Sequence, residues 1–175
     1  AKLKGGVENR RWSPDGRWLL LISGVGEPDK DVKVVRRLPY WFNGRGLVYN
    51  VYKHLFLLDP RSGEVRQLTR GEREVVNASW SPDGRKVAFI AFSDFLKPYL
   101  RDVYVLDVES GEEERITKES MYLLEVEWSP DGERLAVRGH RMERGFSTHS
   151  KVWVLGLDGD LKLVSGDLDA TNSMN

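Results

Sequence analysis

The feature that most constrains the fold is a pentapeptide, Trp-Ser-Pro-Asp-Gly, which occurs three times, at 12–16, 80–84 and 128–132. The second and third copies lie 48 residues apart, and Asp59 and Asp107 repeat with the same spacing. Self-similarity of this period indicates a chain built from repeated units. The recurring residues with a structural role are Trp12, Asp15, Gly16, Trp80, Asp83, Gly84, Trp128, Asp131 and Gly132.

Each repeat is typical of four short strands separated by turns. Within the pentapeptide, Pro presets φ for a turn, Asp suits the next position and Gly accepts a positive φ. The run that follows each copy is almost continuously apolar, at 18–22, 87–92 and 135–137. Continuous apolarity in a strand predicts burial on both faces of the sheet.

Four antiparallel strands in each unit of about 40–50 residues predict the blades of a β-propeller. We therefore expect an all-β fold: a β-propeller segment of about three four-stranded antiparallel blades, near 7–69, 70–117 and 118–165, with 166–175 linking to a further blade. The repeated Trp residues are expected to pack between blades, and the repeated Asp residues to stabilise turns rather than act as paired catalytic carboxylates.

Three blades form an incomplete ring, because propellers close with about four to eight. The chain is therefore expected to be part of a larger propeller, or to complete a ring by association. The first and last blades would each leave an apolar face without a neighbour, so self-association of these open ends is one expectation.

Composition excludes several classes of function. The 175 residues carry a formal net charge of zero and no cysteine. Without cysteine there is no disulfide framework, thiolate metal site or cysteine nucleophile. The balanced charge predicts no nucleic-acid partner, and no apolar run approaches the ~20 residues that span a bilayer, so no membrane association is expected. With no sign of secretion, we expect a cytoplasmic location, and no cofactor is implied.

Catalytic motifs are weak. The Gly-x-Ser-x-Gly elbow of serine hydrolases does not occur, and its nearest approach is 145–149, in which Ser147 and His149 suggest a nucleophile and base only remotely. His140 and Glu143 have ligand-type side chains three residues apart, but no third ligand is evident. A solvated loop explains both segments better.

The first repeat carries an insertion, about 24–47, between its second and third strands. Its central aromatic residues cannot all face one core from an extended segment, because neighbouring side chains alternate sides. They either pack between blades, which we favour, or are partly displayed toward a cavity. The insertion can also form its own hairpin, flanked by 32–35 and 47–49. The candidate substrate-binding residues are Arg37, Tyr40, Trp41, Phe42 and Arg45.

The pentapeptide repeat and the segment 57–69 resemble the propeller of the prolyl oligopeptidase family of serine peptidases. The insertion, at 31–46, and the segment 139–145 are similar to the acylaminoacyl-peptidase branch of that family. The resemblance implies a propeller that caps an α/β-hydrolase domain with a Ser-Asp-His triad, excludes folded proteins and helps bind peptides. The implied partners are the missing blades, that hydrolase domain and peptide substrates.

An alternative remains, because Tol-type propellers share the pentapeptide. A Tol-like propeller would act as a protein-binding scaffold.

Topology predicts where recognition takes place. In a four-stranded antiparallel blade, the loops between the second and third strands emerge on the same face as the crossings to the next blade. Residues 23–53, 93–101 and 139–150 should therefore cluster with the crossings 70–74 and 118–121. Long loops on a rigid scaffold commonly carry binding functions.

Overall fold

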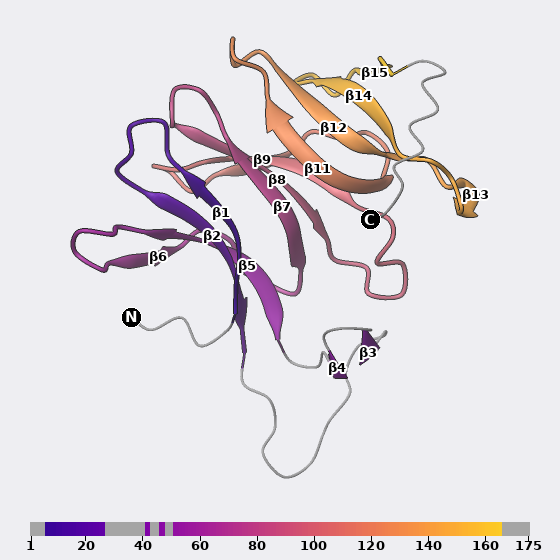
Figure 1. Ribbon diagram of the computed structural model, residues 1–175. Coiled ribbons are helices and arrows are strands. Elements are labelled where there is room, and N and C mark those ends of the chain that lie inside the picture. Colours follow the sequence, from indigo (N-terminus) through magenta and orange to yellow (C-terminus); the bar gives the residue numbers. More distant parts are fainter. Residues whose placement is uncertain (1–5, 27–40, 43–45, 48–50, 166–175) are drawn as a thin grey trace, which may run out of the picture.

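The structure, a computed structural model, describes residues 6–26, 41–42, 46–47 and 51–165. These residues form three four-stranded antiparallel sheets and one two-stranded sheet, and they contain no helix. Figure 1 shows the three large sheets fanned out in chain order. The predicted all-β propeller segment of three blades is therefore confirmed. Since the described part has no helix, it offers none that could cross a bilayer.

The strands of each blade run in chain order across its sheet. The first blade comprises β1 (Val7–Trp12), β2 (Leu19–Val25), β5 (Tyr52–Leu58) and β6 (Val65–Gln67). The second comprises β7 (Glu74–Trp80), β8 (Lys86–Phe92), β9 (Asp102–Asp107) and β10 (Glu113–Arg115). The third comprises β11 (Tyr122–Trp128), β12 (Arg134–His140), β14 (Lys151–Gly156) and β15 (Leu161–Leu163). The remaining strands are β3 (Trp41–Phe42), β4 (Gly46–Leu47) and β13 (Glu143–Phe146).

The pentapeptide folds into a hydrogen-bonded turn. In the second blade, the Ser81 hydroxyl donates to Asp83 Oδ1 at 2.6 Å, and the backbone N–H of Lys86 donates to Ser81 Oγ at 2.8 Å. The hydrogen bond from Ser81, together with one from the backbone N–H of Arg85, lowers the pKa of Asp83. The same serine-to-aspartate bond recurs in the other blades, at Ser13–Asp15 and Ser129–Asp131. Each aspartate thus stabilises a turn.

A second repeated hydrogen bond closes each blade. The hydroxyl at the end of the fourth strand accepts the backbone N–H near the start of the third strand. The three bonds are Leu55 to Thr69 at 3.0 Å, Val103 to Thr117 at 3.2 Å and Val152 to Ser165 at 3.2 Å. This explains why a hydroxyl side chain stands six residues after the glycine of each turn, at Thr69, Thr117 and Ser165, in a position that sequence alone leaves without a role.

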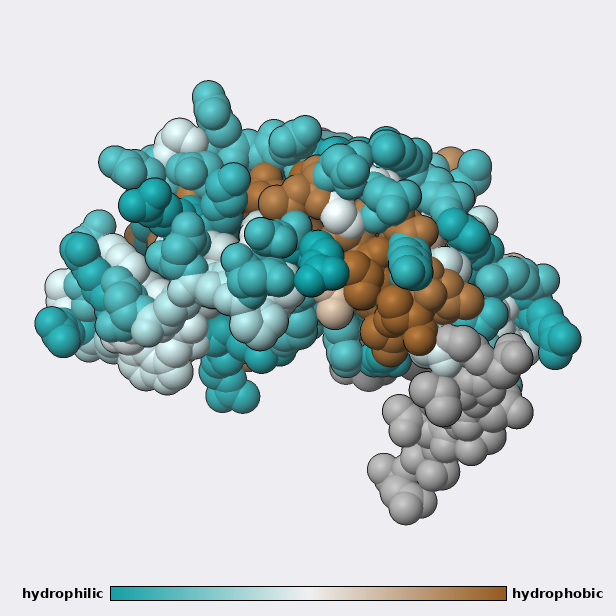
Figure 2. Space-filling model, turned by 90° about the horizontal axis from the view of Figure 1, so that it is seen from above, coloured by the Kyte–Doolittle hydropathy of each residue, from teal (hydrophilic) through white to brown (hydrophobic). Residues whose placement is uncertain are grey.

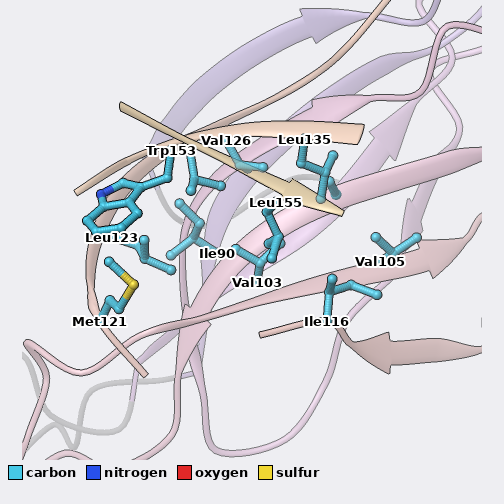
Figure 3. Close-up of a cluster of buried hydrophobic side chains, with 12 residues drawn as sticks. Ile90, Val103, Val105, Ile116, Met121, Leu123, Val126, Leu135, Trp153 and Leu155 are labelled. Carbon is cyan, nitrogen blue, oxygen red and sulfur yellow. The ribbon is translucent and has the colours of Figure 1, made fainter. Parts of the chain in front are cut away.

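The apolar core lies between blades. Trp80 is 8% exposed and packs in the cluster that joins the first and second blades, where its Nε1 donates to the Arg11 carbonyl at 3.3 Å. A second cluster joins the second and third blades, and Figure 3 shows Ile90 and Val103 lying opposite Leu135 and Trp153. Burial between sheets is therefore the main source of stability in this fold.

The turns of successive blades also touch. A Cβ placed on Gly84, whose φ is +70°, would lie 3.4 Å from Pro14 Cδ of the preceding turn. The same relation places Gly132 against Pro82, at 3.6 Å. These are ordinary van der Waals distances, so glycine is needed in this turn for its positive φ.

The third blade differs from the other two in how its second strand is buried. Burial on both faces is confirmed for the central parts of β2 and β8, but it is wrong for β12. There Leu135 and Val137 are buried toward the second blade, whereas Ala136 is exposed. No further described blade covers the trailing face, which we define as the side of the third blade turned away from the second. On it, Arg138 forms an ion pair with Glu125 at 2.8 Å.

Both open faces expose apolar side chains. Trp12, which faces away from the second blade, is 58% exposed. On the trailing face, Val152 and Val164 are 40% and 49% exposed. Figure 2 shows a compact apolar patch over the third blade, surrounded by hydrophilic residues. Contiguous exposed apolar surface of this kind commonly marks an interface.

Replacing Trp80 with alanine is expected to lower the free energy of unfolding by about 3–5 kcal/mol, because it leaves a cavity between two blades. Trp12→Ala is the matched control, since it changes the equivalent residue where no described blade packs, and should cost roughly 0.5–1 kcal/mol. Urea denaturation of both variants measures the difference. Equal losses would contradict the assignment of Trp80 to an interblade core.

Two copies of the chain are expected to associate head to tail in solution, with the first blade of one copy against the third blade of the other. Each of these end blades has an open face whose apolar surface only a neighbouring blade can bury. Sedimentation velocity at micromolar concentration should show a species larger than the 20.1 kDa chain. Val152→Asp, which places a charge in the trailing patch, should shift the distribution toward monomer. A wild-type chain that stays monomeric throughout this range would contradict the expectation.

Candidate functional site

Long loops and interblade crossings meet on one side of the fan. We call this side the loop face and define it by the loops 93–101 and 141–150 and the crossings 70–73 and 116–121; it lies toward the bottom and right of Figure 1. Ring contacts join successive blades across it. Tyr52 contacts Phe95 with ring centroids 5.6 Å apart, and Tyr99 contacts Phe146 at 5.8 Å. The predicted clustering of these loops is therefore present where the structure describes them.

The residues predicted to bind substrate lie mostly beyond the described part. Trp41 and Phe42 form β3, which pairs with β4 so that Trp41 lies opposite Leu47. The insertion thus contains a hairpin, and β4 includes Leu47 of the expected flank 47–49, whereas 48–49 and the other flank, 32–35, lie outside the described residues. The structure leaves the expected binding role untested, because Arg37, Tyr40 and Arg45 fall outside the described residues.

Arg101 is the centre of a cluster that sequence reasoning missed. Its guanidinium carbon lies 4.6 Å from the centroid of the Tyr122 ring and 6.0 Å from that of Phe92. Its Nη1 donates to the Leu123 carbonyl at 2.7 Å, and its Nε donates to the Pro98 carbonyl at 3.2 Å. Burial lowers the pKa of Arg101, whereas the neighbouring Tyr122 raises it. The cation is therefore fixed in a partly desolvated position between two blades.

Tyr122 also links Arg101 to the third blade. Its ring contacts His140 at a centroid distance of 4.9 Å and Phe146 at 5.9 Å. Close backbone contact makes this arrangement possible, because a Cβ on Gly139 would lie 2.3 Å from the Tyr122 carbonyl oxygen. Any larger residue at position 139 would force β11 and β12 apart.

The loop that carries Phe146 is held by its own hydrogen bonds. Thr148 Oγ1 accepts the backbone N–H of Arg144 at 2.7 Å and donates to the Gly145 carbonyl at 2.9 Å. Gly145 has a φ of +59°, which reverses the chain just before Phe146. As a result, the Phe146 side chain projects into solvent, 72% exposed.

The polar residues of this loop form no catalytic arrangement. Ser147 and His149 are both exposed, and no hydrogen bond joins them. His140 is buried, and its Nδ1 accepts the backbone N–H of Met142 at 3.1 Å. Among the residues that the structure describes, no three His, Cys, Asp or Glu side chains gather as metal ligands. The Arg101 cluster offers aromatic rings and a guanidinium, which are groups suited to binding a ligand.

The repeat marks these residues only in part. Arg101 directly precedes β9 and follows Lys53 by 48 residues, so the repeat holds a cation at both positions, whereas Phe146 ends β13, a strand outside the four of the third blade. The repeated cations are a sequence signal, but whether each is paired depends on which carboxylates lie nearby.

Burial of His140 predicts a pH dependence of stability. Burial lowers the pKa of His140 below its usual 6.5, although nearby Glu143 raises it. The unfolded chain therefore binds the proton more readily, so the free energy of unfolding should fall as the pH drops from about 7 to 5. In His140→Gln, whose amide oxygen can still accept the Met142 N–H, this fall should be smaller.

Urea denaturation at pH 7, 6 and 5 measures the effect. His54, buried with its pKa lowered by desolvation and by Arg73, contributes to the same fall and remains in both proteins. An identical pH dependence of the wild type and His140→Gln would refute the role of His140.

Comparisons with known proteins place the chain in a family. Residues 2–167 match the sequence profile described as "Acylaminoacyl-peptidase, N-terminal beta-propeller domain". A Bacillus subtilis protein, the uncharacterized peptidase YuxL, is 31% identical over 98 aligned positions, covering 49% of this chain and 15% of that protein.

Solved structures agree on the fold. Acylaminoacyl peptidase from Pyrococcus horikoshii superposes with a TM-score of 0.72 at 22% identity, covering 97% of this chain and 26% of that one. TolB from Acinetobacter baumannii superposes at 0.61 with 19% identity, covering 91% of this chain and 32% of that one. The chain thus spans a third or less of each of these relatives. Because the family profile matches nearly its whole length, the chain belongs to the family of acylaminoacyl-peptidase N-terminal β-propeller domains.

Proposed function

We propose that this chain is the noncatalytic propeller portion of a serine peptidase of the acylaminoacyl-peptidase type, which gates and helps bind peptide substrates for an α/β-hydrolase domain. The observation that carries the proposal is the loop face of a chain from this family, where aromatic side chains and a fixed guanidinium stand together. The hydrolase domain and further blades are proposed partners in the parent protein.

The chemistry of the loop face suits peptides. Aromatic rings bind apolar side chains over a large area at little entropic cost. Phe146 and Tyr99 provide such rings, and Arg101 provides donors for carbonyl or carboxylate oxygens. Since the chain has no Gly-x-Ser-x-Gly elbow, the peptide bond would be cleaved by another domain.

A second candidate is a Tol-like scaffold that binds folded proteins. The observation in its favour is the superposition with TolB over 91% of this chain. A scaffold of this kind would use a broad surface, such as the apolar patch of the trailing face, rather than the loop face. The two candidates therefore predict different binding surfaces.

The test is an NMR titration of the 15N-labelled chain with short N-acetylated peptide amides that contain phenylalanine. Shifts are expected at the loop face, near Tyr99 and Phe146. Phe146→Ser should weaken binding about five- to tenfold, because one aromatic contact contributes roughly 1–1.5 kcal/mol. The matched control, Val152→Ser on the trailing face, should leave the affinity unchanged.

Shifts confined to the trailing face would instead favour the scaffold, and an absence of shifts would refute peptide binding by this chain. The isolated chain should also release no nitroaniline from acyl-amino-acid nitroanilides above the background rate. Turnover that disappears in Ser147→Ala would show that the chain is itself catalytic and would overturn the noncatalytic role.

A further inference from the structure

Arg101 differs from most other partly buried cations in the described chain because it has no carboxylate partner. Lys53, Arg73 and Arg138, for example, each form an ion pair with an acidic side chain. The Arg101 side chain donates to two main-chain carbonyls, those of Pro98 and Leu123, and interacts with the Tyr122 hydroxyl, which are all neutral acceptors. A desolvated cation is normally paired with an anion, since neutral acceptors compensate only part of the lost hydration.

In the first blade, the position equivalent to Arg101 holds a cation that does have a carboxylate partner. Lys53 precedes His54, which lies opposite Ser23, just as Arg101 precedes Asp102, which lies opposite Ala91. The two cations therefore occupy equivalent positions. Lys53 is paired with the carboxylate of Glu8 on β1. In the described part of the second blade, no carboxylate is paired with Arg101 in this way.

Three carboxylates near Arg101 in the chain are already engaged: Asp94 accepts the backbone N–H of Leu96, and the other two are Asp102 and Glu119. Asp102 accepts hydrogen bonds from Arg115 and from the Thr117 hydroxyl, both at 2.8 Å. Glu119, on the crossing to the third blade, is paired with Arg141 at 2.5 Å. An anion that forms an ion pair with Arg101 would therefore come from outside these elements.

One edge of the guanidinium is open to such an anion. Besides the bonds of Nε and Nη1, the guanidinium interacts with the Tyr122 hydroxyl, and Nη2 donates to no described carboxylate. The guanidinium carbon lies over the Tyr122 ring, and two main-chain carbonyls hold the group in place, so an edge remains for the planar fork of a carboxylate.

Aromatic rings lie next to Arg101. The Tyr122 ring contacts Arg101 with one part and the exposed Phe146 with another, and Phe146 in turn contacts Tyr99. A ligand that reaches Arg101 would therefore have an aromatic surface beside its carboxylate. This combination matches a peptide that bears a carboxylate next to an apolar side chain.

We infer that Arg101 binds a carboxylate of a short peptide, either its free C-terminus or an acidic side chain, while the adjacent apolar side chain lies against Phe146 and Tyr99. The inference rests on the proposed peptide-binding function and adds the chemical class of ligand that the site selects.

Isothermal titration calorimetry of the chain with three peptides tests it. The peptides are N-acetyl-Gly-Gly-Phe as free acid, the same peptide as amide, and N-acetyl-Gly-Glu-Phe amide. At least one carboxylate-bearing peptide should bind about tenfold more tightly than the Gly-Gly-Phe amide, and which one does so identifies the source of the carboxylate. The preference should disappear in Arg101→Gln. It should persist in Arg134→Gln, the matched control, because Arg134 is an exposed arginine on a turn far from the loop face along β12.

Equal binding of all three peptides would overturn the carboxylate inference and leave the proposed peptide role intact. Binding of none would overturn both. If circular dichroism shows that Arg101→Gln does not fold, the Nε resonance of Arg101 in the wild type decides. A shift with the preferred peptide but not with the amide supports the inference, and the same response to both refutes it.

Discussion

The rest of this structure depends on apolar contact between neighbouring sheets. A single four-stranded blade is too thin to bury its own side chains, so most of the apolar core of the described chain lies between neighbouring blades. The middle blade has both neighbours, and its β8 is almost entirely buried. At the two ends of the fan, the same design leaves Trp12 exposed and places the Glu125–Arg138 pair on the surface of the third blade.

Polar repeats complement this packing by fixing where each strand turns. The serine and aspartate of each pentapeptide form a local hydrogen-bonded unit, and a hydroxyl at the end of each fourth strand holds the start of the third. These bonds satisfy backbone groups where the sheet ends, which would otherwise be costly to bury. Contacts such as Gly84 against Pro14 then align one turn with the next. Strand positions, and with them the loops, follow from this alignment.

The residues of the loop face differ from one blade to the next, unlike the regular turns and strands. The 141–150 loop projects Phe146, and Arg101 occupies the position where the first blade has the Lys53–Glu8 pair. The repeat thus places a cation in both blades, but whether that cation is paired depends on which blade carries it. The structure brings Arg101, Tyr122 and Phe146 together from three separate segments. The sequence-based candidates in the insertion were chosen because aromatic residues are adjacent in the chain, which does not reveal cross-blade contacts.

By itself, the sequence determined the repeat, the four-stranded units, the turn chemistry and the face on which the long loops emerge. These follow from local rules: turn residues set backbone angles, apolar periodicity sets burial, and antiparallel connectivity sets the loop side. Only the tertiary structure decided that β12 is buried on one face alone, and that Arg101 stacks on Tyr122 without a carboxylate. Burial and ion pairing depend on which segments pack together across blades, and that is a property of distance in space rather than along the chain.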